Sequence, residues 1–252
     1  MGYLGLSGGH YRPLSEEQVQ TIHEASLQIL ENTGMTYEPG LHGTVELLER
    51  NGASVDRDRA RVTFPREMIL EQADKAPEQV VLFSRNGKYD LDLGEDRVHV
   101  GTGGAAVKIL DPDSGEVRST TLRDLYALGR LVDKLENIHF FLRPCIPTDI
   151  PESAYDLNVF YTCLKATSKH VMAGVNDEQG LKNVLEMVSL LAGGQEELAR
   201  RPFISVITSF AISPLKLCTQ STKIMQEAVR RGIPVALSSA PMAGSTAPYT
   251  MA

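Results

Sequence analysis

The sequence predicts an α/β fold, because short apolar runs alternate with helical patterns through the larger part of the chain. Four runs of strand length begin near Ile138, Val171, Phe203 and Val235, and they recur about every 32 residues. Each interval leaves room for a helix of about ten or more residues, and connections of that length join parallel strands through right-handed crossovers. Periodicity alone fits both a parallel barrel and a doubly wound sheet.

Composition narrows the class of protein. The 252 residues, 42% of them hydrophobic, suffice for one large globular domain or two small ones. A net charge of −7 disfavours nucleic acid as a partner. The three cysteines, Cys145, Cys163 and Cys218, lack C-x-x-C spacing and are odd in number, which favours reduced thiols in a cytoplasmic protein. No apolar run approaches the roughly 18 residues of a membrane span, so we expect none.

The sequence pattern of residues 1–95 predicts an N-terminal α+β cap. Ser15-Glu-Glu-Gln18 has the form of a capping box and opens an amphipathic helix that ends before Gly34. Four further elements follow: a helix over 41–50, a hairpin over 55–64, a helix between Pro65 and Pro77, and a hairpin of strands 80–83 and 89–93 around Asn86-Gly87. This cap either assists the formation of a homo-oligomer or closes one end of the following domain.

From Val98 onward the strand and helix units begin. We expect a first strand through Gly101, an inserted hairpin that turns at 111–115, and a helix opened by the capping box Thr121-Leu-Arg-Asp124. Ser153-Ala-Tyr-Asp156 predicts the start of another helix. Ser213-Pro214 predicts an N-cap followed by proline at the first helical position, in a helix that ends at Gly232.

Several segments resemble one known family when they are taken in order. They are Gly101-Thr-Gly-Gly104, Thr148-Asp-Ile-Pro151, Thr167-Ser-Lys169, Leu191-Ala-Gly-Gly194, Ile212-Ser-Pro-Leu215 and the tail from Ala240 to Ala252. Together they resemble the trimethylamine methyltransferase family, and this chain is about half as long as complete members of that family. The resemblance implies a TIM-type (β/α) barrel, of which residues 96–252 would supply about five of the eight strands. The absence of G-x-G-x-x-G between a strand and a helix also favours the barrel over a doubly wound sheet.

In such a barrel the site lies at the carboxyl ends of the strands, so the residues after each apolar run are the candidates for substrate binding. They are Thr102, Gly103, Asp149, Asn176, Phe210, Ser213, Ser239, Met242, Thr246 and Tyr249. We expect one carboxylate, no histidine and no arginine at the strand ends, which disfavours acid–base hydrolysis and phosphoryl transfer. No metal ligand set is expected, and the catalytic residues stay unassigned.

The resemblance implies a reaction that needs little proton transfer. A methyl group would pass from a small methylated amine to the Co(I) of a separate corrinoid protein, so the corrinoid is supplied by that partner and is not bound as a resident cofactor. A quaternary ammonium substrate already has a neutral amine as its leaving group, which favours a compound such as glycine betaine. Trimethylamine-specific members use pyrrolysine, at a position beyond residue 252. Phe210 and Tyr249 are candidates for cation–π contact with the substrate.

Several of the candidate residues also have a purely structural interpretation. Asp149 and Ser213 are possible helix caps, and Phe210 and Tyr249 are possible core or interface aromatics. Lys169 and His170 precede a strand, at the face of a barrel where side chains serve stability.

Two other functions stay open at this point. One is a catalytically inert fragment or binding module of the same fold, whose open strand edges would need a cover. The other is a barrel lyase or aldolase, which the lack of a lysine or carboxylate pair at the strand ends disfavours.

Overall fold

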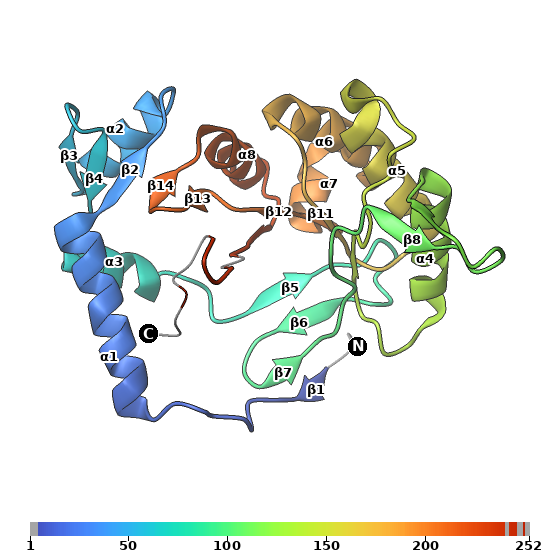
Figure 1. Cartoon of the computed structure of the whole chain (residues 1–252), viewed down its shortest axis with the longest axis horizontal. Helices are drawn as coiled ribbons and strands as arrows, with labels where there is room; N and C mark the ends of the chain where they lie inside the picture. Colours follow the sequence, from blue (N-terminus) through green and yellow to red (C-terminus); the bar gives the residue numbers. More distant parts are fainter. Residues whose placement is uncertain (1–4, 240–241, 246–248, 250–252) are drawn as a thin grey trace. The chain divides into compact units, whose positions relative to one another are not determined.

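The computed structural model describes residues 5–239, 242–245 and 249, which form two compact units (Figure 1). Unit 1 contains the described parts of 1–8, 79–208 and 223–236, and unit 2 contains those of 9–78, 209–222 and 237–252. Both units are built from discontinuous stretches of chain. The boundary that the sequence predicts near residue 95 lies within unit 1. It stays a prediction, because the two units are defined by their internal contacts and not by a division into cap and barrel.

A four-stranded sheet organises unit 1. Its strands are β10 (Phe141–Leu142), β11 (Val171–Ala173), β12 (Ile204–Thr208) and β15 (Val235–Leu237), and they neighbour one another in that order. β10, β11 and β12 pair in parallel. The four apolar runs are thus confirmed as strands, and the order along the sheet equals the order along the sequence.

The first predicted strand is reduced to a single parallel bridge, from Gly101 to Phe140. The prediction placed Val98 in this strand, and that is wrong. Val98 belongs to β7 (Arg97–Val98), which pairs antiparallel with β1 (Leu6–Ser7), so its backbone groups are used by another partner.

Helices connect the parallel strands of unit 1. They are α4 (Leu122–Lys134), α5 (Tyr155–Ala166), α6 (Glu178–Ala192), α7 (Gln195–Arg200) and α8 (Thr219–Arg230), which enters unit 1 at residue 223. Each of α4, α5 and α6 turns an apolar face to the core, where Phe160 of α5 and Val184 of α6 are fully buried. The capping box at Thr121 is confirmed, since its hydroxyl and the carboxylate of Asp124 exchange hydrogen bonds with each other's backbone N–H groups.

Two of the predicted helix starts are wrong. Helix α5 follows a 3₁₀ turn (Glu152–Ala154), and its N-cap is Ala154, with no side-chain cap from Ser153. Helix α8 begins at Thr219 and not at Ser213, because residues 211–217 form the hairpin of β13 (Ala211–Ile212) and β14 (Lys216–Leu217). Pairing with a neighbouring strand uses the backbone groups that a first helical turn would have needed.

Two predicted hairpins of unit 1 are confirmed. β5 (Val80–Leu82) pairs with β6 (Leu91–Leu93) around Gly87, whose φ of 75° suits glycine. β8 (Lys108–Leu110) pairs with β9 (Val117–Ser119) and forms the insertion before α4.

Unit 2 contains the predicted helices and hairpin of the N-terminal region. Its elements are α1 (Glu16–Gln28), a π-helical turn (Ile29–Thr33), β2 (Met35–Tyr37), α2 (His42–Arg50), β3 (Ser54–Asp56), β4 (Arg61–Thr63) and α3 (Arg66–Asp74). β13 and β14 join β2, β4 and β3 in one five-stranded sheet. The capping box at Ser15 is confirmed. The apolar face of α1 is largely exposed, however, and Leu27 is the buried residue of this helix.

Within the described ranges, no helix is both long and apolar enough to cross a membrane. The three cysteines are unpaired, as the sequence predicts.

Candidate functional site at the ends of the parallel strands

Thr102 and Gly103 lie beside the end of β10. The hydroxyl of Thr102 donates a hydrogen bond to the carbonyl oxygen of Leu142, with 2.6 Å between the oxygens. Gly103 is exposed, and a Cβ at this position would come no nearer than 4.0 Å to Leu142. Gly101, in contrast, packs directly on Phe140, where a Cβ would be 2.2 Å from a ring carbon. Close packing therefore requires glycine at 101, whereas Gly103 leaves open space beside the strand end.

Arg143 follows β10 directly, so the prediction of no arginine at the strand ends is wrong. Its backbone N–H donates to the carbonyl oxygen of Met172, and its Nη1 donates to the hydroxyl of Tyr155 at 2.8 Å. Burial raises the pKa of the Tyr155 hydroxyl, which keeps it protonated beside the guanidinium.

Asp156 is a buried carboxylate that sequence reasoning assigned only to a helix start. Its side chain is on α5, with 7% of the residue exposed, and Oδ2 accepts the backbone N–H of Asn176 at 2.9 Å. Burial raises the pKa of Asp156. Asn176 itself is exposed just beyond β11. The ends of β10 and β11 are therefore more polar than the sequence predicts. The sequence signal for this is a pair of charged residues, Arg143 and Asp156, in the segment that follows β10.

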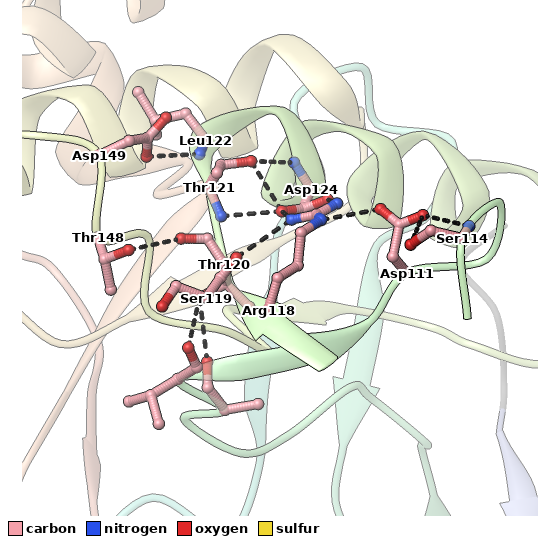
Figure 2. A network of polar contacts seen from close by, with 12 residues as sticks. Asp111, Ser114, Arg118, Ser119, Thr120, Thr121, Leu122, Asp124, Thr148 and Asp149 are labelled. Atoms are coloured by element: carbon pink, nitrogen blue, oxygen red, sulfur yellow. Dashed lines mark hydrogen bonds and ion pairs between the residues drawn. The ribbon is translucent and has the colours of Figure 1, made fainter. Parts of the chain in front are cut away.

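Asp149 caps a helix, but not the helix that follows it in sequence. Its Oδ1 accepts the backbone N–H of Leu122, the first residue of α4, at 3.0 Å (Figure 2). Beside it, Thr148 donates from its hydroxyl to the carbonyl oxygen of Thr120. Because Asp149 is held by a partner 27 residues earlier, its local sequence could not reveal this role.

The same region holds a salt-bridge network around Arg118 (Figure 2). Its guanidinium contacts Asp124 through both terminal nitrogens, at 2.7 and 2.8 Å, and Asp111 through Nε at 2.8 Å. Hydrogen bonds from the Arg118 guanidinium, and from the hydroxyl and backbone N–H of Thr121, hold the pKa of Asp124 well below its usual range. The pKa of Asp111 is lowered to about 2, by the backbone N–H of Ser114 and by Arg118. These contacts bind the β8–β9 hairpin to the start of α4.

The remaining candidates that the structure describes lie in unit 2. Phe210 is partly buried and packs against the apolar cluster that includes Met35, Val62 and Leu217. Ser213 is an exposed residue of the β13–β14 turn and caps no helix. The others lie at the end of the described chain: Ser239, Met242 and Tyr249 are exposed, and Thr246 lies outside the described residues. Phe210 thus fits its structural interpretation, whereas the ring of Tyr249, with 88% of the residue exposed, is accessible.

Lys169 and His170 have the structural roles that the sequence predicts. The ammonium group of Lys169 donates to the carbonyl oxygens of Val132, Leu135 and Ile138 at 2.7, 2.6 and 2.5 Å. His170 is fully buried and bonds through its two ring nitrogens to the Phe83 carbonyl and the Ser205 hydroxyl. Burial lowers the pKa of His170 to about 4, so the ring is neutral near pH 7.

Comparison with known proteins places the chain in a family. The family model described as trimethylamine methyltransferase (MTTB) matches residues 6–252. The chain belongs to the MTTB family. The resemblance predicted from the sequence is thereby confirmed.

Among MTTB relatives, the trimethylamine methyltransferase MttB of Desulfitobacterium hafniense is 34% identical over 249 residues, which is 99% of this chain and 49% of that protein. The glycine betaine methyltransferase of Desulfitobacterium hafniense is 30% identical, over 96% of this chain and 50% of that protein. MttB of Methanosarcina thermophila is 27% identical, over 100% of this chain and 52% of that protein. The chain thus spans about half the length of the curated MTTB relatives it matches.

Among solved structures, the crystal structure of the hydroxylamine MtmB complex matches with a TM-score of 0.49 and 12% identity, over 85% of this chain and 49% of that chain.

Proposed function

We propose that the sheet of unit 1 is the first part of a TIM-type (β/α) barrel. The Gly101 bridge, β10, β11, β12 and β15 would be its first five strands. Their order along the sheet supports this proposal, because a doubly wound sheet reverses its strand order at a switch point, whereas a barrel follows the sequence. Roughly 155 residues after Val98 are too few for a barrel of about 250, so the other strands would come from the rest of a longer protein.

The proposed activity of that longer protein is methyl transfer from a methylated amine to the Co(I) of a cognate corrinoid protein. The observation that carries it is the MTTB match over residues 6–252. Relatives named for trimethylamine and for glycine betaine both cover nearly the whole chain. The corrinoid is the methyl acceptor that the partner protein brings.

The proposed step balances without an external acid when the substrate is a quaternary amine. A lone pair of Co(I) attacks the methyl carbon, the carbon–nitrogen bond breaks, and its electron pair stays on nitrogen. The products are a neutral tertiary amine and methyl-Co(III). Orientation and exclusion of water then limit the rate. Within unit 1, Thr102, Gly103 and Asn176 are the proposed candidates for substrate contact. Because a quaternary amine already has a neutral leaving group, a compound such as glycine betaine is the preferred substrate.

The test uses the protein encoded by the complete reading frame together with its cognate corrinoid protein. Glycine betaine should convert Co(I) to methyl-Co(III), seen as a change in the visible absorption of the corrinoid, while trimethylamine should not. An in-frame amber codon after Ala252, with activity on trimethylamine, would replace the quaternary amine by trimethylamine as substrate. Absence of methyl transfer from either amine would overturn the proposal and favour a binding module.

A further inference from the structure

Helix α1 carries an apolar strip that the described residues leave largely uncovered. The strip consists of Val19, Ile22, Ser26 and Ile29, the last of which directly follows the helix. Its three large side chains belong to residues that are 53%, 58% and 46% exposed, in sequence order. A helix of 13 residues is marginal in water unless it packs against a neighbour. A partner that covers the strip would therefore stabilise α1.

The strip lies on the side of α1 that does not hold the helix to unit 2. Leu27 is the buried residue of α1, and the carboxylate of Glu24 accepts a hydrogen bond from Arg66 of α3 at 2.6 Å. At about 100° per residue, Leu27 and Glu24 lie about 140° and 160° around the helix from Ile22. The other members of the strip lie within about 60° of Ile22. The strip therefore faces away from the contacts that anchor α1.

The spacing and charge of the strip suit a second helix. Its four members follow one another at intervals of three, four and three residues, which is the spacing of positions a and d in a coiled coil. The acidic residues Glu16, Glu17 and Glu24 lie about 120° or more around the helix from Ile22. An uncharged strip disfavours a charged partner, such as an anionic lipid surface, and matches another uncharged apolar strip.

The strip is complementary to itself when two copies of α1 run antiparallel. Ile22 then lies opposite the partner's Ser26, and Val19 lies opposite the partner's Ile29. A large side chain thus meets a small one in both central layers, and the two helix dipoles oppose each other. A parallel pair would set Ser26 against the partner's Ser26, which leaves a gap, and would bring the two acidic first turns together.

We propose that two copies of this protein associate through the antiparallel pairing of their α1 helices about a two-fold axis. The inference concerns self-association alone, so it does not rest on the proposed methyl transfer. Two helices of this length bury less than the roughly 1,200 Å² of total surface at which stable specific interfaces begin. The contact should therefore be weak and should depend on the concentration of the protein.

Disulfide formation tests the register in the protein encoded by the complete reading frame. The double variant Ile22→Cys/Ser26→Cys should form disulfide-linked dimers under mild oxidation, because each introduced thiol lies opposite the other one of the partner. Gln20→Cys/Gln28→Cys is the matched control, since both glutamines are exposed on α1 but lie about 120° or more from Ile22. Ile22→Cys alone should link at least about tenfold less, because antiparallel pairing separates the two copies of residue 22.

Three results of this experiment count against the pairing. A double variant that forms no dimers overturns it, as would happen if another part of the longer protein covered the strip. Equal linking in the glutamine control means that the strip is not the contact. Equal linking in Ile22→Cys alone indicates parallel helices and overturns the antiparallel register.

Sedimentation velocity tests the affinity without cross-links. Ile22→Glu should weaken self-association at least about tenfold, because pairing would enclose a carboxylate in each central layer without a donor. Since Ile22 is exposed in the single copy, this variant should fold, which circular dichroism checks. Gln20→Glu places the same carboxylate outside the strip and should associate like wild type. Equal association of folded Ile22→Glu and wild type would refute the assignment of the strip.

Discussion

The ammonium group of Lys169 lies 2.6 Å from the carbonyl oxygen of Leu135, directly after the last turn of helix α4. Two further carbonyl oxygens, those of Val132 and Ile138, accept from the same nitrogen. A helix leaves its last carbonyl groups without partners, and a cation placed there also matches the negative end of the helix dipole. One side chain from the loop before β11 thus closes the end of a helix that precedes it by more than thirty residues.

Replacing this lysine should destabilise unit 1. In Lys169→Met the apolar stem remains but three carbonyl groups lose the ammonium donor, and those of Val132 and Leu135 keep only a backbone N–H, so we expect the free energy of unfolding to fall by about 1–3 kcal/mol. Urea denaturation followed by circular dichroism measures this difference. Lys134→Met makes the same change at an exposed residue of the same helix end and should alter stability by less than about 0.5 kcal/mol.

Stability should depend on pH through His170. Burial lowers the pKa of this residue to about 4 in the folded protein, below the usual value of about 6.5. Neutral His170 therefore makes its full contribution to the free energy of unfolding above about pH 6.5. This contribution is lost as the pH falls from there through about 4, because the unfolded chain binds the proton at a higher pH than the folded protein does. At most about 3 kcal/mol is lost in this interval. Unfolding measured at a series of pH values should show a smaller slope in His170→Gln, and exposed His10→Gln serves as control.

A second dependence on pH, at lower pH, should come from the Arg118 network. The pKa of Asp111 is lowered to about 2 and that of Asp124 is held further below its usual range, so both carboxylates stabilise the fold above about pH 4. This stability is lost as the pH falls through the folded pKa values. Asp124→Asn should therefore melt at a lower temperature than wild type at pH 7, and the difference should shrink below about pH 4. Asp113→Asn, exposed in the same hairpin, should melt like wild type at pH 7.

Two glycines in helices should respond oppositely to alanine. A Cβ on Gly129 of α4 would lie 2.5 Å from the Cβ of Ala166, so Gly129→Ala should cost about 1–3 kcal/mol by overpacking. Gly43 of α2 has no atom within 4 Å of the added Cβ, and Gly43→Ala should stabilise by about 0.5–1 kcal/mol through helix propensity. Hydrogen exchange of the amides in each helix reports the two effects separately. Equal effects of the two changes would contradict the close contact between α4 and α5.

Local signals in the sequence predict local structure well. The capping boxes at Ser15 and Thr121 and the four apolar runs depend on neighbours within a few residues, and the structure contains all of them. Ser213-Pro214 has an equally good local pattern for a helix start. There the strand β2, about 180 residues earlier, pairs with β14 and converts the segment into a hairpin.

The candidate site was harder to predict for the same reason. Asp149 is bonded to the start of α4, and Asp156 is bonded to the residue after β11, so both roles depend on contacts at least 20 residues away. Asp156 also looks ordinary in sequence, as one acidic residue at a helix start. Its burial, which gives it a raised pKa and a donor-free oxygen, exists only once α5 and α6 pack together.

The strand order of the parallel sheet has a consequence for how the chain folds during synthesis. Each strand from β11 onward pairs with the strand made about thirty residues before it, so only short loops need to close and the sheet can grow as the chain leaves the ribosome. The sheet of unit 2 behaves differently. In that sheet Thr36 of β2 pairs with Lys216 of β14, so β2 cannot form this pairing until residue 216 has been translated.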